Sequence, residues 1–184
     1  MQSSGKKAIR RIWRRPTREE GSIIISKLEY FGKNVPENVL RGHVIYILEI
    51  TRKEAFLVKK ESSELIEIFQ PYSAGITLGE FKGKTFTLSL AGGYIVSKYA
   101  TKKRVFLDKE GSINFTYGKD ASGPDIDDWD PDIEDGDIVI VLSYEREFLG
   151  FGKARVANLR VVEVKNIVDI GWYLRSEIDE RKSR

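Results

Sequence analysis

The chain has 184 residues, of which 41% are hydrophobic, and a formal net charge of +3 at pH 7. This length suits one large or two small domains. Cysteine is absent and His43 is the single histidine, which excludes disulfides, thiolate metal sites and cysteine nucleophiles and leaves little for histidine-based catalysis. No apolar run approaches the roughly 18 to 20 residues of a membrane span, and the first residues lack the apolar stretch of a secretory signal. We therefore expect a soluble, intracellular protein.

The modest net charge conceals an uneven distribution. Eight acidic residues and no basic one lie between Asp125 and Asp137. With those eight negative charges set aside from the total of +3, the rest of the chain carries +11. Such a balance is typical of a protein that binds a polyanion.

The first 18 residues contain seven basic side chains and no acidic one, with Trp13 among them. This composition fits a basic arm, residues 1–15, in which Arg14 and Arg15 contact phosphates and the indole stacks on a base. It fits a solvated tail equally well. Thr17 and Glu20 then form a capping-box pattern, which predicts a helix over about residues 18–33.

The rest of the first hundred residues alternates between strand and helix patterns. Strands are predicted at 44–50, 55–58, 78–81 and 85–90, and helices at 62–69 and 91–99. Residues 16–99 are therefore predicted to form an α/β domain with a mainly antiparallel sheet and flanking helices, so the fold class of the chain is α+β.

From residue 102 onward, strands and loops dominate. Strands are predicted at 104–107, 138–144, 149–156 and 161–164, a helical turn at 113–117, and a terminal turn or helix at 167–174. We place the domain boundary at 98–101, so that 100–178 form the second domain and 179–184 a charged tail. Since no Gly/Ser-rich linker separates the halves, we expect them to pack together.

A candidate nucleic-acid surface lies on the strands of the second domain. Alternation along 149–156 places Phe151, Lys153 and Arg155 on one face, and the next strand turns Val161, Glu163 and Lys165 outward, just after Arg160. Cations neutralise phosphates and an aromatic ring stacks on unpaired bases, so this face suits RNA. Outward lysines and arginines also simply keep a sheet soluble, and that alternative stays open.

The acidic stretch 125–137 does not fit a calcium-binding EF-hand loop, because no starting residue gives both the glycine at position six and the glutamate at position twelve. A solvated loop is favoured over a metal site, and the loop could instead compete with RNA for the basic surface or engage a basic partner. The sequence also lacks a Walker loop, a His/Glu metal motif and a strand-turn-helix serine nucleophile. We therefore expect no catalytic residues, cofactor or metal.

Several short motifs together resemble a known family, and they run in order along residues 15–177. They are Arg15-Pro16-Thr17-Arg18-Glu19-Glu20, Leu78-Gly79-Glu80-Phe81-Lys82-Gly83-Lys84, Phe115-Thr116-Tyr117-Gly118, Leu149-Gly150-Phe151-Gly152 and Asp169-Ile170-Gly171-Trp172-Tyr173-Leu174-Arg175. The chain resembles the archaeal and eukaryotic large-ribosomal-subunit biogenesis proteins that join an N-terminal α/β domain to a C-terminal PUA domain.

The resemblance implies a PUA-type mixed β-barrel and a non-catalytic protein that binds uridine- or adenine/uridine-rich single-stranded RNA in pre-rRNA processing. It implies pre-ribosomal or exosome processing proteins as partners and Arg155, Arg160 and Lys165, with Lys153 nearby, as the RNA surface. We expect a cytoplasmic monomer, nuclear or nucleolar in a eukaryote. The basic extension before Arg15 and the acidic stretch depart from the family pattern.

Two other functions remain open. PUA domains often accompany RNA-modifying enzymes, so the chain could be such an enzyme or its accessory subunit, although the first hundred residues are few for those catalytic domains. A scaffold that binds only proteins is the third possibility.

Overall fold

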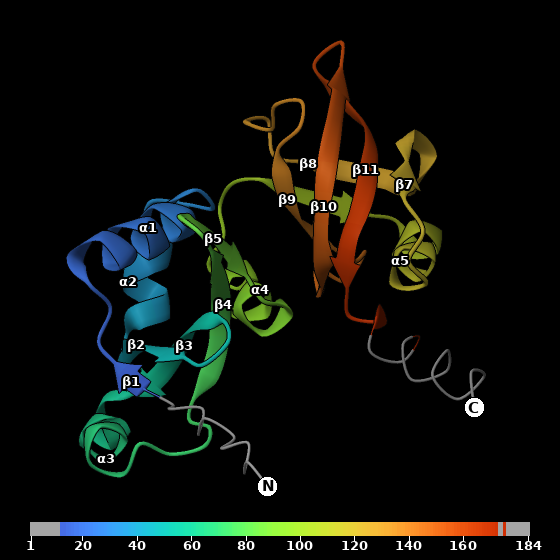
Figure 1. Ribbon diagram of the computed structural model, residues 1–184. Coiled ribbons are helices and arrows are strands. Elements are labelled where there is room, and N and C mark those ends of the chain that lie inside the picture. Colours follow the sequence, from blue (N-terminus) through green and yellow to red (C-terminus); the bar gives the residue numbers. More distant parts are fainter. Residues whose placement is uncertain (1–11, 173–174, 176–184) are drawn as a thin grey trace, which may run out of the picture.

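The computed structural model describes residues 12–172 together with Arg175, arranged around two sheets (Figure 1). The first half contains strands β1 (Ile12–Arg14), β2 (His43–Glu49), β3 (Lys53–Lys59), β4 (Ile76–Lys82) and β5 (Thr85–Leu88), helices α1 (Arg18–Glu29), α2 (Val35–Leu40), α3 (Ser63–Phe69) and α4 (Leu90–Ser97), and the 3-10 turn η1 (Lys60–Ser62). Its strands pair in chain order and each pair is antiparallel. The expected antiparallel sheet with flanking helices is confirmed.

The second half forms a mixed sheet. It contains strands β6 (Arg104–Leu107), β7 (Ala121–Ser122), β8 (Ile126–Trp129), β9 (Ile138–Leu142), β10 (Phe148–Ala157) and β11 (Arg160–Asp169), helix α5 (Lys109–Thr116) and the 3-10 turn η2 (Gly123–Asp125). The strand order is β7-β11-β10-β9-β6-β8, with only the β6–β9 pair parallel. Because β11 also contacts β8, the sheet curves toward closure, which confirms the expected mixed barrel.

Several elements differ from the sequence prediction. Helix α1 ends at Glu29, and α2, which was not predicted, follows with proline in its first turn. Helix α5 is a full helix rather than a turn, since the Asp108 carboxylate caps it by accepting from the Gly111 amide at 2.7 Å. The predicted strand 161–164 lies in the first half of the longer β11, which also takes in the start of the predicted turn at 167–174.

The N-terminal arm is also partly structured. Residues 12–14 form β1, which pairs with β2, and Trp13 is buried against Phe56 with 5.0 Å between the ring centroids. The Trp13 indole donates to the Pro71 carbonyl at 2.7 Å. The expectation that this indole stacks on a nucleic-acid base is therefore wrong, because the ring is part of the core. The arm before Ile12 lies outside the described residues.

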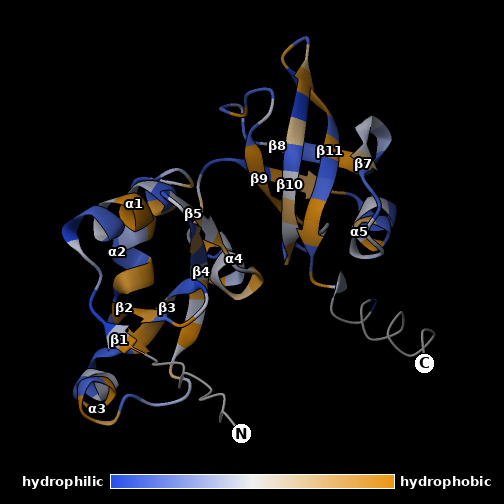
Figure 2. Ribbon diagram, in the orientation of Figure 1, coloured by the Kyte–Doolittle hydropathy of each residue, from blue (hydrophilic) through white to orange (hydrophobic). Residues whose placement is uncertain are grey.

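One hydrophobic core joins the two halves, as expected from the missing linker. It contains α1 and α4 side chains from the first half and Phe148 and Phe151 of β10 from the second. Gly93 of α4 makes the contact possible, since a Cβ there would lie 2.5 Å from the Phe151 ring and 2.6 Å from the Phe148 ring. Helix α4 thus lies between the sheets (Figure 1), and hydrophobic segments of both halves meet there (Figure 2).

Candidate nucleic-acid interface

The predicted cations gather on the β10–β11 hairpin. In this antiparallel ladder Lys153 lies opposite Lys165 and Arg155 lies opposite Glu163. Lys153, Arg155, Lys165 and Arg160 are all exposed. The tip of the hairpin extends beyond the rest of the barrel (Figure 1), whereas Lys153 lies where β10 still pairs with β9.

Few direct ion pairs hold the cations of this surface, and the acidic stretch lies beside β10, where the Ala154 amide donates to the Asp137 carbonyl at 2.8 Å. Lys153, Arg160 and Lys165 form no ion pair with any residue in the described part of the chain, and Arg155 has only an exposed contact of 3.5 Å with Glu163. Like charges directly opposite on paired strands are unfavourable. The pair of lysines therefore costs the fold a little stability, and an anion lying across the ladder would remove that cost. We define these four cations as the hairpin surface.

Phe151 does not belong to the hairpin surface. Its side chain is 5% exposed and packs on Phe148 and Phe31, with ring centroids 5.5 and 6.2 Å away. The first half of the chain covers this end of β10, so the same strand face that carries exposed cations further along is buried here. The expectation of an exposed aromatic at Phe151 is wrong, and so is that of an outward Val161, which is buried opposite Val156.

Arg14 and Arg15 lie on the other sheet and are held by carboxylates. Arg14 contacts Glu20 at 2.7 Å and Glu49 at 3.1 Å. Arg15 lies 3.3 Å from a Glu67 oxygen, with its guanidinium over the Tyr46 ring at 4.3 Å. Both ion-paired side chains stabilise the N-terminal sheet, and the structure does not bring them together with the hairpin surface.

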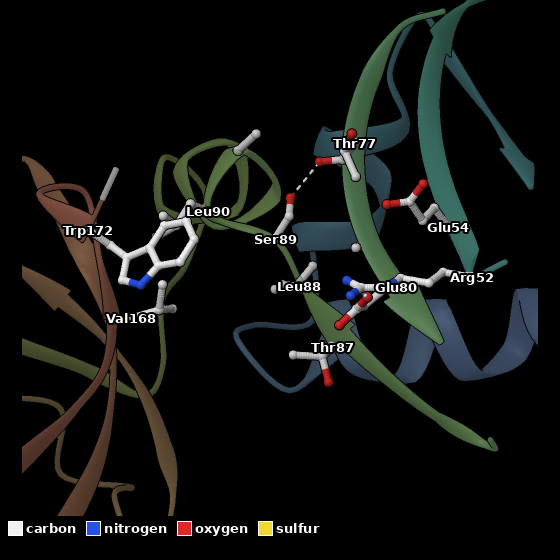
Figure 3. A pocket seen from close by; sticks show the side chains of 12 residues that line it. Arg52, Glu54, Thr77, Glu80, Thr87, Leu88, Ser89, Leu90, Val168 and Trp172 are labelled. Atoms are coloured by element: carbon white, nitrogen blue, oxygen red, sulfur yellow. Dashed lines mark hydrogen bonds and ion pairs between the residues drawn. The ribbon is translucent and has the colours of Figure 1, made fainter. Parts of the chain in front are cut away.

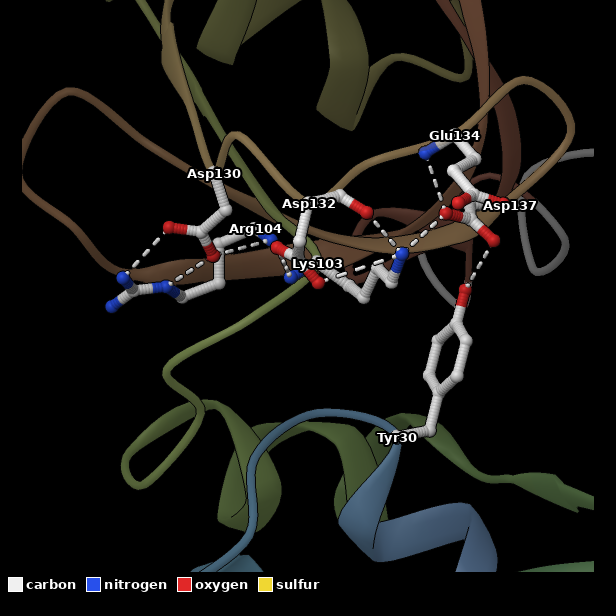
Figure 4. A network of polar contacts seen from close by, with 7 residues as sticks. All are labelled: Tyr30, Lys103, Arg104, Asp130, Asp132, Glu134 and Asp137. Carbon is white, nitrogen blue, oxygen red and sulfur yellow. Dashed lines mark hydrogen bonds and ion pairs between the residues drawn. The ribbon is translucent and has the colours of Figure 1, made fainter.

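The acidic stretch is tied into the fold rather than solvated throughout. Residues 126–129 form β8, and Asp130 accepts from the Arg104 guanidinium at 2.8 and 2.9 Å (Figure 4). The Val156 amide donates to Asp135 at 2.9 Å. Within the described residues no ion pair joins this stretch to the hairpin surface, and no group of three or more metal-ligating side chains occurs.

Asp137 connects the acidic stretch to the first half of the chain. It accepts from Lys103 Nζ at 2.7 Å and from the Tyr30 hydroxyl at 3.0 Å (Figure 4). Burial opposes the ionised form of Asp137, but hydrogen bonds from Lys103, the Glu134 amide and Tyr30 outweigh it and lower the pKa of the carboxyl. Burial and the contact with Asp137 raise the pKa of Tyr30. The carboxylate therefore stays charged and holds the two halves together.

The motifs that suggested a PUA domain form a structural clamp. Asp169 is 1% exposed and binds Arg175 through two contacts of 2.9 and 2.7 Å, while the Gly171 amide donates to it at 2.8 Å. Arg175 also donates to the Thr116 carbonyl, and Asn166 to Asp169 at 3.1 Å. The clamp fixes the C-terminal end of β11 against helix α5. Its members shape the module, and the contact between Arg175 and Thr116, which are 59 positions apart in sequence, gave no local signal.

A cleft of about 470 Å³ opens between the two halves, beside the end of β11 (Figure 3). Its lining includes an Arg52–Glu80 ion pair of 3.5 Å, Ser89, whose hydroxyl donates to the Thr77 carbonyl at 2.6 Å, and the half-exposed Trp172. Sequence reasoning did not predict this cleft, because its lining residues come from separate segments of both halves. The Ser89 hydroxyl is a helix cap, since it accepts from the Gly92 amide.

Comparisons with known proteins agree with this architecture. A family model described as the UPF0113 PUA domain matches residues 103–178, and one described as the NIP7/UPF0113 pre-PUA domain matches residues 13–90. A UPF0113 protein of Archaeoglobus fulgidus is 29% identical over 172 residues, which are 90% of this chain and 95% of the relative.

Solved structures show the same fold. A hypothetical protein of Pyrococcus horikoshii superposes with a TM-score of 0.59 at 17% identity, over 89% of this chain and 99% of the other. A conserved PUA domain protein of Thermoplasma acidophilum gives a TM-score of 0.59 at 16% identity, over 90% and 99%. The PUA match points to RNA as the ligand. Within the described residues no helix is long and apolar enough to cross a membrane.

Proposed function

This chain belongs to the NIP7/UPF0113 family, and we propose that it is a non-catalytic factor that binds single-stranded RNA through the hairpin surface. The observation that carries this proposal is the Lys153–Lys165 pair with Arg155 and Arg160 beside it, four exposed cations that form a single ion pair, Arg155–Glu163, within the described residues. Phosphates supply most of the affinity of such a surface. The proposed RNA is uridine- or adenine/uridine-rich, as the family resemblance implies.

The hairpin surface favours a flexible strand over a duplex. Its cations follow a narrow two-stranded ladder, along which alternate side chains on one strand are spaced by roughly 6 to 7 Å. A single strand can adjust its backbone to that track, and proteins that recognise RNA sequence mostly bind unpaired segments. With Phe151 buried, affinity comes from phosphate contacts rather than from stacking on this residue.

The proposed biological role is in pre-rRNA processing and large-subunit assembly, with the protein acting as an adaptor between RNA and processing factors such as the exosome. The shared core of the two halves supports this role, since one rigid unit can present RNA on the barrel and a second surface on the N-terminal sheet. We further propose that the protein is a cytoplasmic monomer and that residues 16–99 and 100–178 are its two domains.

Fluorescence anisotropy with labelled oligonucleotides tests the RNA-binding proposal. Uridine-rich single strands should bind more tightly than a duplex of the same length. If all four cations contact phosphates, the slope of log affinity against log salt should be about −3, from roughly −0.7 per phosphate contacted. Absence of binding at low salt, or preference for the duplex, would contradict the proposal.

Turnover assays address the non-catalytic part of the proposal. The purified protein is incubated with unmodified ribosomal RNA and S-adenosylmethionine as methyl donor. Liquid chromatography and mass spectrometry of the digested RNA should then detect no modified nucleoside. A modified base that accumulates with time and enzyme concentration would instead support an RNA-modifying enzyme. The Arg52–Glu80 cleft would then be the first place to look for its active site.

A further inference from the structure

Helix α3 presents a stripe of large apolar side chains to solvent. Leu65, Ile68, Phe69 and Tyr72 are 53%, 70%, 71% and 75% exposed. Spacings of three and four residues place Leu65, Ile68 and Phe69 on one side of α3, and Tyr72 follows in the loop after the helix ends at Phe69. Single exposed apolar residues are common, whereas a contiguous group of this kind marks an interaction site.

The opposite side of α3 anchors the helix firmly to the N-terminal sheet. Ile66 is buried with Trp13 and Phe56. Glu67 accepts from the Tyr46 hydroxyl at 2.6 Å, and Gln70 accepts from the Trp13 amide at 2.8 Å. These contacts fix the orientation of the helix, so the exposed stripe is presented on a rigid base and would lose little freedom on binding.

The stripe has an acidic border. Glu61 lies just before α3 and Glu64 in its first turn, and neither forms an ion pair within the described part of the chain. The exposed Lys59 and Lys60 directly precede Glu61, and no basic residue follows them until Lys82. The stripe is therefore complementary to an apolar surface bordered by lysine or arginine, and its carboxylates repel phosphate.

We propose that α3 is the docking site for an amphipathic, basic segment of a protein partner. This inference rests on the adaptor part of the proposed function and assigns a location to it. RNA is disfavoured as the occupant by the two carboxylates. A second copy of the chain is disfavoured as well, because symmetric pairing would bring equal acidic borders together.

The position of α3 fits an adaptor. The helix lies at the end of the N-terminal sheet that is remote from the β10–β11 hairpin (Figure 1), and its ribbon contains both hydrophobic and hydrophilic residues (Figure 2). RNA on the hairpin surface and a protein on α3 would not collide. Both ligands can therefore be held by the same molecule.

A designed peptide tests the proposal with the full chain. The probe is a fluorescent helical peptide of roughly 15 residues with leucines at helical spacing and lysines elsewhere, and its comparison peptides are a scrambled version and one with glutamate in place of lysine. We expect the lysine peptide to bind best. The triple change Leu65→Ser, Ile68→Ser, Phe69→Ser should weaken its binding at least tenfold, because exposed anchors of this kind dominate interface energies.

Charge exchange tests the acidic border. The double change Glu61→Lys, Glu64→Lys should weaken binding of the lysine peptide and strengthen binding of the glutamate peptide. A control for the serine changes lies at the end of α5, where Ile113→Ser with Tyr117→Ser removes side chains that are 51% and 68% exposed and should change nothing. All of these side chains are exposed, so unchanged melting curves will verify that each variant is folded.

The outcomes separate this proposal from RNA binding. Charge reversal on the hairpin surface should abolish RNA binding and leave peptide binding intact, and the α3 changes should do the reverse. Equal binding of the scrambled peptide, or no loss in the triple variant, would overturn the α3 proposal. So would a concentration-dependent dimer in sedimentation that the triple variant abolishes, since the occupant would then be a second copy.

Discussion

Lys153 lies directly opposite Lys165 on the β10–β11 ladder, so two like charges face each other on the most protruding hairpin of the barrel. Such a pair is unfavourable for folding. Lys165→Glu should therefore raise the free energy of unfolding by roughly 0.2–1 kcal/mol while it weakens RNA binding. Urea denaturation and fluorescence anisotropy measure the two effects. The control is Lys33→Glu, an exposed lysine of the first half, and RNA affinity unchanged by Lys165→Glu would remove this lysine from the interface.

Gly93 of α4 tests the packing between the two halves. A methyl group there would lie about 2.5 Å from the Phe148 and Phe151 rings, and overpacking of this kind costs about 1–3 kcal/mol. We expect Gly93→Ala to lower the free energy of unfolding by that amount in thermal or urea denaturation. Gly21→Ala is the control, because nothing lies within 4 Å of its added methyl group. Equal stability of the two variants would argue against close packing of Gly93 on the Phe148 and Phe151 rings.

Leu159 at the tip of the hairpin occupies a backbone conformation that glycine tolerates better. It has φ +62°, follows Asn158 with φ +51°, and is 93% exposed. Leu159→Gly should therefore stabilise the fold by roughly 0.5–1 kcal/mol, after the higher chain entropy of glycine is subtracted. Calorimetry should show a melting temperature higher by about 1 to 4 °C. Leu159→Ala keeps the Cβ and should give no gain; a similar gain from alanine would refute the backbone explanation.

Glu20 should make the N-terminal sheet sensitive to acid. Hydrogen bonds from Arg14 lower the pKa of this buried carboxyl far below its ordinary value, assisted by the Thr17 amide and Lys53. Because the folded-state pKa is depressed, the carboxylate stabilises the fold above its unfolded pKa of about 4, and this stabilisation is lost as pH falls toward the folded-state value. Glu20→Gln should be less stable than the parent at pH 7, with the difference shrinking below pH 4 in urea titrations. A difference independent of pH would contradict this assignment.

The sequence predicted strand positions better than it predicted burial. Alternation correctly placed Lys153, Arg155 and Lys165 outward, because each strand turns successive side chains to opposite faces. It failed for Phe151, since periodicity cannot show that the other half of the chain covers that end of β10. It failed for Val161 because a register shift between Arg155 and Val156 moves the facing residues by one position.

Long-range partnerships were likewise beyond sequence reasoning. The capping box at Thr17 and Glu20 was predicted and is present, because both partners lie within one helical turn. Arg14 had no such local signal, and its pairing with Glu20 and Glu49 depends on how β1 joins the sheet. The same holds for the acidic stretch, whose anchors Arg104 and Tyr30 lie far away in sequence.

The most direct test of the central claim is the RNA affinity of the triple charge reversal Arg155→Glu, Arg160→Glu, Lys165→Glu. The control is a triple reversal of exposed lysines outside the hairpin, Lys33→Glu, Lys84→Glu and Lys109→Glu, which changes the net charge equally. With a uridine-rich single strand at low salt, the hairpin variant should lose at least a hundredfold in affinity while the control loses only a few-fold. Equal affinities of the two variants would show that RNA binds elsewhere.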